Sequence, residues 1–224
     1  MQNTTRDTKW NRLGASTGYL AAALGFVAAS FERGAPAADA PAEQFLSYFT
    51  RYRAELLAQS LFFVLSAGAL LWFIGSLRAF LRRREQGDGR ISGIAFGSGI
   101  LWIGMQLVLQ AAQVALALST ADELSPAVAR MMGNLTYALS VVAYVPLGVM
   151  LAAVAVGTLR SRAFPAWLGW VSAAAALFNI VMSAGLAAQN GPLVPGGLLT
   201  YALYGVNAVW QIAAPTLMIV RAAR

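Results

Sequence analysis

Six apolar runs, each long enough to cross a lipid bilayer, restrict this sequence more than any other feature. A membrane-spanning helix needs roughly 20 apolar residues. The runs cover Leu13–Phe31, Leu56–Phe80, Ile91–Leu118, Val128–Leu159, Phe164–Ala187 and Gly197–Val220. Inside the hydrocarbon core, backbone polar groups must be bonded within their own segment, which favours helices. The runs therefore predict an all-α fold, a six-helix transmembrane bundle that forms one membrane domain over residues 1–224.

The composition also separates this chain from soluble proteins. Hydrophobic residues make up 58% of the 224 residues and charged residues 11%, whereas soluble domains carry about 25% charged residues. The first apolar run follows three basic residues, as the core of a cleaved signal peptide does. Its apolar length of about 19 residues is that of a membrane span, so we expect it to be retained.

The distribution of basic residues predicts the orientation. With the N-terminus inside, twelve basic residues lie in the inner segments and four in the outer segments, and the four outer ones are Arg33, Arg51, Arg53 and Arg130. This positive-inside bias predicts a multi-pass protein of the inner, cytoplasmic membrane with both termini cytoplasmic. It also accounts for the net charge of +7, so we expect no nucleic-acid partner.

The first outer loop contains four aromatic residues with helical spacing. Phe45, Tyr48, Phe49 and Tyr52 are spaced i, i+3, i+4 and i+7, and Pro41 suits the first turn of a helix. The pattern predicts a short interfacial amphipathic helix with its rings at headgroup depth. A lid over an outward-opening pocket and a bent helix continuous with the second span are the alternatives.

Small residues, prolines and arginines suggest how the helices pack and where they are anchored. Gly14–Gly18 and Gly93–Gly97 both match the GxxxG pattern, and we interpret both as close helix contacts within the monomer. Pro146 and Pro215 lie inside spans and predict kinks. The inner run from Arg82 to Arg84 is a topology anchor or, alternatively, a site that recruits anionic lipid headgroups.

Uncharged polar side chains recur on single faces of the later spans and gather, by their depth, from the middle of the membrane outward. An amide that faced lipid unpaired would cost several kcal/mol, so these groups should face the bundle interior. They are either interhelical hydrogen bonds or the lining of an outward-opening pocket for a small amphiphilic, lipid-like ligand. The candidate ligand-binding residues are Gln106, Gln110, Gln113, Asn134, Tyr137, Asn179, Tyr204, Asn207 and Gln211.

The sequence lacks the residue types that several kinds of catalytic or metal site require. The sequence has no Cys and no His, and no Asp, Glu or Lys in the middle of a span. Thiolate or imidazole metal sites, proton relays and a Schiff-base lysine are thereby disfavoured. Ser and Tyr are present, but no base is available to activate them. We expect no catalytic residue, no metal, no cofactor and no enzymatic activity.

Three segments resemble a known family. They are Pro41-Ala42-Glu43 with the aromatic run up to Leu57, Leu71-Trp72-Phe73 followed by Leu77-Arg78, and the run from Phe164-Pro165-Ala166-Trp167 to Trp170. Together they resemble the domain-of-unknown-function family 4386, uncharacterised bacterial multi-span membrane proteins. The resemblance implies the six-span topology and brings no activity, cofactor or catalytic residue.

Two functions from different classes follow from these observations. One is a membrane protein that binds or moves a small amphiphilic ligand, and the other is a non-catalytic structural or regulatory subunit that packs against a partner. A binder should have a cavity lined by Gln110, Asn134, Asn179 and Asn207, and a scaffold should have those amides bonded to one another. Membrane lipids are the expected partners in both cases, and a homo-oligomer or a membrane partner protein stays open.

Overall fold

The computed structural model describes residues 2–119, 124–187, 192–193 and 198–222, and every element in these ranges is helical. Six spans are long and apolar enough to cross a membrane, as the hydropathy predicts. The elements are α1 (Gln2–Ser30), α2 (Ala42–Arg51), α3 (Arg53–Arg82), α4 (Arg90–Leu118), α5 (Pro126–Val142), α6 (Tyr144–Ser161), α7 (Ala166–Met182), the short 3-10 helix η1 (Ser183–Ala187) and α8 (Leu198–Ala222).

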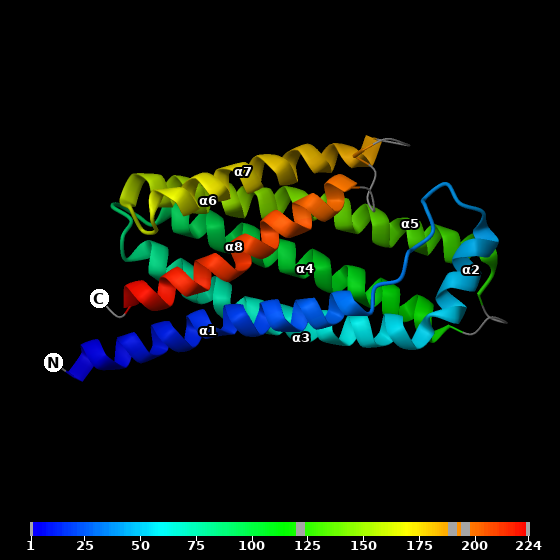
Figure 1. Ribbon diagram of the computed structural model, residues 1–224, viewed down its shortest axis with the longest axis horizontal. Coiled ribbons are helices and arrows are strands. Elements are labelled where there is room, and N and C mark those ends of the chain that lie inside the picture. The colour runs from blue at the N-terminus through cyan, green and yellow to red at the C-terminus, as the bar shows by residue number, and fades with distance from the viewer. Residues whose placement is uncertain (1, 120–123, 188–191, 194–197, 223–224) are drawn as a thin grey trace.

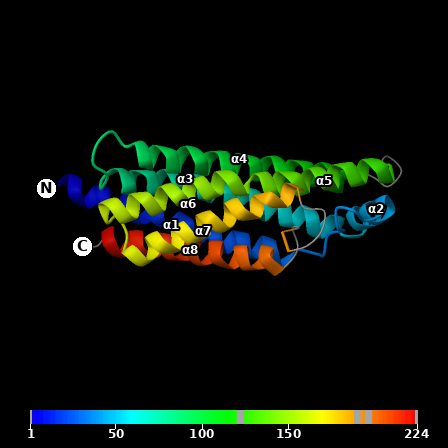
Figure 2. The ribbon, with the colours of Figure 1, turned by 90° about the horizontal axis from the view of Figure 1, so that it is seen from above.

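The spans form a closed ring. In order around it, α1 packs on α3, α3 on α4, α4 on α6, α6 on α7, α7 on α8, and α8 returns to α1. Both views place the two ends of the chain at one end of the bundle and α2 at the other (Figures 1 and 2). The main core lies inside this ring and includes Phe73, Ile103, Met150 and Trp210. A chain with an even number of spans must return to the side where it began, and the shared end agrees with that.

The helix bounds lie close to the apolar runs, and the two prolines act differently. The fourth span is divided at Ala143 into α5 and α6. Pro146 lacks the N–H that would bond the carbonyl of Val142, the last residue of α5, which explains the division. α8 continues through Pro215. The predicted start of the sixth span at Gly197 lies outside the described residues.

Helix α2 lies in the connection between α1 and α3, at the end of the bundle opposite the two chain ends, and is separated from α3 at Tyr52 (Figure 1). The two are therefore not one continuous helix. Phe45 and Phe49 are buried in a cluster with Leu56, Leu116 and Ala129. A Cβ on Gly133 of α5 would lie 2.6 Å from the Phe45 ring, so α2 packs against α5 at a residue without a side chain. These two rings contact protein, and the interfacial placement of α2 stays a prediction.

The two GxxxG patterns have opposite environments. A Cβ on Gly14 would overlap Ser76 of α3, and a Cβ on Gly18 would lie 2.8 Å from Phe73 and 3.0 Å from Pro215. The first pattern therefore forms a close contact within the monomer, as predicted. The prediction is wrong for the second pattern, because a Cβ on Gly93 or Gly97 would meet no described neighbour within 4 Å. That face of α4 points out of the bundle.

Two polar contacts fix the loops at the end of the bundle that carries both termini. Glu85 accepts hydrogen bonds from the backbone N–H of Ile91 (2.7 Å) and Ser92 (3.0 Å), and so caps the start of α4. Arg221 of α8 donates hydrogen bonds of 2.7 Å to the carbonyls of Arg162 and Ala163 in the turn between α6 and α7. The last helix is thereby tied to the turn that precedes α7.

Candidate functional site

A cavity of about 120 Å³ lies between α1, α3, α4 and α8. Most of its lining is apolar, and its polar side chains come from α3, α4 and α8. The lining residues are Gly25, Phe63, Ser66, Ala67, Leu70, Trp102, Ile103, Gln106, Leu107, Gln110 and Gln211. Counting about 1.5 Å per residue from the ends of α4 and α8 that lie opposite the chain termini, Gln110 lies roughly 12 Å deep and Gln211 roughly 20 Å deep. The cavity therefore extends from that half of the bundle to its middle.

Gln110 is the lining residue whose buried polar atom lacks a hydrogen-bond partner. Its side chain is 5% exposed, and its Oε1 has no hydrogen-bond partner among the described residues. A buried acceptor left unbonded is unfavourable by about 1–3 kcal/mol. The one hydroxyl among the lining residues is satisfied, because Ser66 donates a 2.8 Å hydrogen bond to the Ala21 carbonyl. A donor that entered the cavity would therefore be stabilised at Gln110.

Gln211 brings a second acceptor to the same region. It lines the cavity from α8, four residues before Pro215. Since proline has no N–H, the helical hydrogen bond to the Gln211 carbonyl cannot form. Gln106 lies one helical turn from Gln110 and lines the cavity from α4. Three amide side chains thus surround a space whose other walls, Trp102 and Leu107 among them, are apolar.

The remaining glutamine of α4 is bonded to protein. The Nε2 of Gln113 lies 3.0 Å from Gln59 Oε1, 3.0 Å from Ser60 Oγ and 3.3 Å from the Leu56 carbonyl. These contacts join α4 to α3 near the end of the bundle that carries α2. Gln113 is therefore an interhelical tie in this structure and does not line the cavity.

Asn179 and Asn207 pair with each other across the contact between α7 and α8. Asn179 Nδ2 donates to Asn207 Oδ1 at 3.1 Å, and Asn207 Nδ2 donates to Asn179 Oδ1 at 3.4 Å. Asn179 also bonds the Ala175 carbonyl at 2.8 Å. One helix turn further, Trp210 Nε1 donates a 2.9 Å hydrogen bond to Ser172 Oγ. The α7–α8 seam, defined by these four side chains, is thus fully hydrogen-bonded.

The last three candidates lie towards the end of the bundle opposite the chain termini. Asn134 donates a 3.3 Å hydrogen bond to the Ala38 carbonyl and so holds the connection between α1 and α2 against α5. Tyr137 is partly buried against a small cluster that includes Met182 and Leu203. Tyr204 is 46% exposed and meets the ring of Tyr201 edge-on. The structure therefore brings Gln106, Gln110 and Gln211 together at the cavity and places the other candidates elsewhere.

Sequence reasoning did not place the apolar walls of the cavity. Phe63, Trp102 and Leu107 line it, but each belongs to an apolar run in which nearly every residue is hydrophobic. Ser66 shares a helix face with Gln59 in the second span, and that spacing was the available signal for α3. Gly25 shares the small-residue face of the first span with Gly14 and Gly18, and that spacing indicated close helix packing and not a cavity.

Comparisons with known proteins identify no relative, since no family model, no curated protein and no solved structure matches the chain. The resemblance to the uncharacterised bacterial family therefore stays a prediction.

Proposed function

We propose that this protein binds a small amphiphilic, lipid-like molecule in the cavity between α1, α3, α4 and α8. One observation carries the proposal: Gln110 lines this space, and its buried Oε1 has no hydrogen-bond partner among the described residues. A ligand hydroxyl or amide N–H bonded to that oxygen removes the penalty of the unpaired acceptor. The apolar walls then take up the hydrocarbon part of the ligand.

The dimensions restrict the class of ligand. A cavity of about 120 Å³ is comparable with apolar protein cavities of about 150 Å³ that hold a benzene-sized group. It has room for a neutral polar group and the first few carbons attached to it. The lining contains no charged side chain, which disfavours a phosphate or a carboxylate. A long-chain alcohol, isoprenoid alcohols included, fits this chemistry.

The bonded amides favour a second candidate, a non-catalytic structural or regulatory subunit. The pair formed by Asn179 and Asn207 and the tie made by Gln113 show that part of the polar set holds helices together. A scaffold would need no ligand at Gln110. The two candidates therefore differ in whether a probe enters the cavity.

The test uses the full-length protein in detergent micelles and two photoreactive probes. One is a long-chain primary alcohol that carries a diazirine, and the other is the matching alkane without the hydroxyl. The alcohol should label peptides of α4 and α8 near Trp102 and Gln211, and the alkane should label them several-fold less. Equal labelling by both probes, or no labelling at these helices, contradicts the proposal.

Two variants sharpen this experiment. Gln110→Leu removes the acceptor and should reduce alcohol labelling to the level of the alkane. Asn207→Leu alters the α7–α8 seam instead and serves as the control, since labelling at the cavity should persist in the molecules that stay folded. If both variants lose labelling equally, the hydrogen bond to Gln110 is not what selects the alcohol.

The orientation is part of the proposal. The arginine distribution supports an inner-membrane protein with cytoplasmic termini, and the shared position of the two chain ends agrees with it (Figure 1). A peptide tag after Arg224 should resist protease added to intact cells and be cleaved in inverted vesicles. Cleavage in intact cells would reverse the orientation and leave the cavity unaffected.

A further inference from the structure

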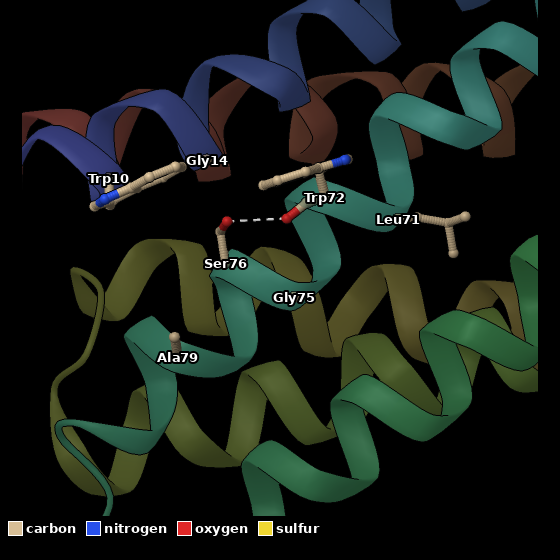
Figure 3. A pocket seen from close by; sticks show the side chains of 7 residues that line it. All are labelled: Trp10, Gly14, Leu71, Trp72, Gly75, Ser76 and Ala79. Atoms are coloured by element: carbon tan, nitrogen blue, oxygen red, sulfur yellow. Dashed lines mark hydrogen bonds between the residues drawn. The ribbon is translucent and has the colours of Figure 1, made fainter. Parts of the chain in front are cut away.

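A second concave site, the α1–α3 groove, lies on the outer surface of the bundle and plays no part in the cavity above. It has a volume of about 480 Å³ and is lined by Trp10 and Gly14 of α1 and by Leu71, Trp72, Gly75, Ser76 and Ala79 of α3. In Figure 3 the rings of Trp10 and Trp72 lie on either side of Ser76. Small residues thus form the floor, and two indoles border it.

The floor of the groove suits a hydrocarbon chain. Its one hydroxyl is already satisfied, because Ser76 Oγ donates a 2.9 Å hydrogen bond to the Trp72 carbonyl of its own helix. A Cβ on Gly75 would meet nothing within 4 Å, so the surface is open at that point. The floor of the groove therefore has no hydroxyl that requires water or a further protein partner.

Trp72 lies too deep along α3 to act as an anchor at headgroup level. Trp72 is 62% exposed and lies ten residues before Arg82, the last residue of α3, which corresponds to roughly 15 Å along the helix. Tryptophan is enriched at headgroup depth, where its N–H meets water. Trp10 is 55% exposed. It lies roughly 12 Å closer than Trp72 to the end of the bundle that carries both termini, because α1 runs antiparallel to α3. The indoles therefore border a strip that runs into one leaflet.

Positive charge stands where this strip reaches the membrane surface. Arg82 and Arg83 are exposed and follow Ala79 by three and four residues, which places their backbone positions one turn beyond the groove on the same side of α3. The Arg82 side chain extends over Gly89 at the start of α4. The segment from Arg78 to Arg90 contains five arginines and two carboxylates. An anionic headgroup is therefore favoured there over a zwitterionic one.

We infer that the α1–α3 groove binds one anionic glycerophospholipid of the leaflet at the chain-terminal end. An acyl chain lies over Gly75 and Ser76 between the two indoles, and the phosphate faces Arg82 and Arg83. The groove accommodates the acyl chain, and the arginines attract the anionic headgroup. The site should therefore bind this lipid in preference to the other lipids around the helices.

The experiment places the full-length protein in phosphatidylcholine vesicles that contain a small, equal fraction of a photoreactive probe lipid. The probe is phosphatidylglycerol or phosphatidylcholine with the same diazirine-bearing acyl chain. The measured quantity is the ratio of phosphatidylglycerol to phosphatidylcholine label on the α3 peptide with Trp72 and Ala79. It is compared with the same ratio on the α7 peptide with Trp167 and Trp170, which are also exposed and lie near Arg162.

The ratio on α3 should exceed that on α7 roughly fivefold, the equivalent of about 1 kcal/mol for one added basic contact. Gly75→Leu fills the groove and should bring the α3 ratio down to the α7 value. Gly97→Leu, at an equally open glycine of α4, is the matched control and should leave the ratio unchanged. Equal ratios on the two peptides of the unmodified protein overturn the inference, as does a high α3 ratio that survives Gly75→Leu.

Discussion

The α7–α8 seam and the cavity beside Gln110 use the same chemistry with opposite outcomes. Both contain intramembrane amides that face the bundle interior. In the seam each asparagine finds its partner on the next helix, at 3.1 and 3.4 Å. At the cavity the Gln110 oxygen is buried without a partner in the described chain. A buried amide can thus hold helices together, or it can be left unpaired and available to a ligand. The outcome depends on whether the neighbouring helix offers a hydrogen-bond partner.

The largest expected effect comes from breaking the seam. Asn207→Leu removes both interhelical hydrogen bonds and leaves the fully buried Asn179 partly unpaired. We expect the free energy of unfolding in micelles to fall by about 2 kcal/mol. Denaturant titration followed by circular dichroism measures it. The double variant Asn179→Leu with Asn207→Leu should recover most of the loss, because neither partner is then left alone.

The next effect concerns the hydrogen bond between Trp210 and Ser172 in the seam. Trp210→Phe keeps the ring next to Phe73 but removes the indole N–H that bonds Ser172. We expect a loss of about 1 kcal/mol in the same titration. Trp170→Phe, at an exposed ring of α7, is the matched control and should be neutral. A neutral Trp210→Phe would show that the seam depends on the asparagine pair alone.

A smaller effect on the free energy of unfolding is expected at Glu85, which lies in the charged loop between α3 and α4 and outside both amide regions. Burial by itself would raise the pKa of Glu85, but hydrogen bonds from Ser92 and Ile91 and the charge of Arg82 together lower it below its ordinary value. The carboxylate therefore stabilises the fold above pH 4.5, and this contribution is lost as the pH falls through the lowered pKa. Glu85→Gln should reduce stability at pH 6 by about 0.5 kcal/mol.

The same pH series sharpens the comparison of the two amide regions. The difference between Glu85→Gln and the unmodified protein should close as the pH falls below 4.5. The effects of Asn207→Leu and Gln110→Leu should stay constant, because amides do not titrate. An effect of Asn207→Leu that changed across this range would indicate that the seam is coupled to an ionisable group.

The smallest expected loss of stability is that of Gln110→Leu. Removing an unpaired buried acceptor should leave the free energy of unfolding unchanged or raise it by up to about 1 kcal/mol. The same variant should lose the photolabelling by the long-chain alcohol. A loss of 2 kcal/mol, as in the seam, would place Gln110 among the interhelical ties and remove the difference between the two regions.

The spans could be predicted because hydrophobic length is a property of each segment alone. Contacts between segments could not, since they depend on how each helix is rotated against its neighbour. Gly14 and Gly93 begin the same pattern, yet one presses against Ser76 and the other faces outward.

The candidate site shows the same division. Gln110 and Gln113 were expected on one face, and both turn into the bundle: Gln113 bonds α3, and Gln110 lines the cavity. Only Gln113 is level with polar groups there, namely Gln59 and Ser60. Spacing along one helix therefore indicated which amides turn inward. It did not indicate which of them would meet a partner, because that depends on the depth of polar groups on the adjacent helix.

The closed ring has a consequence for biogenesis. The cavity takes Gly25 from the first helix and Gln211 from the last, which leave the ribosome at opposite ends of synthesis. Its walls exist only once α8 has inserted and packed on α1. A ligand held there would stabilise the finished bundle by mass action and could not rescue a chain that stopped before α8.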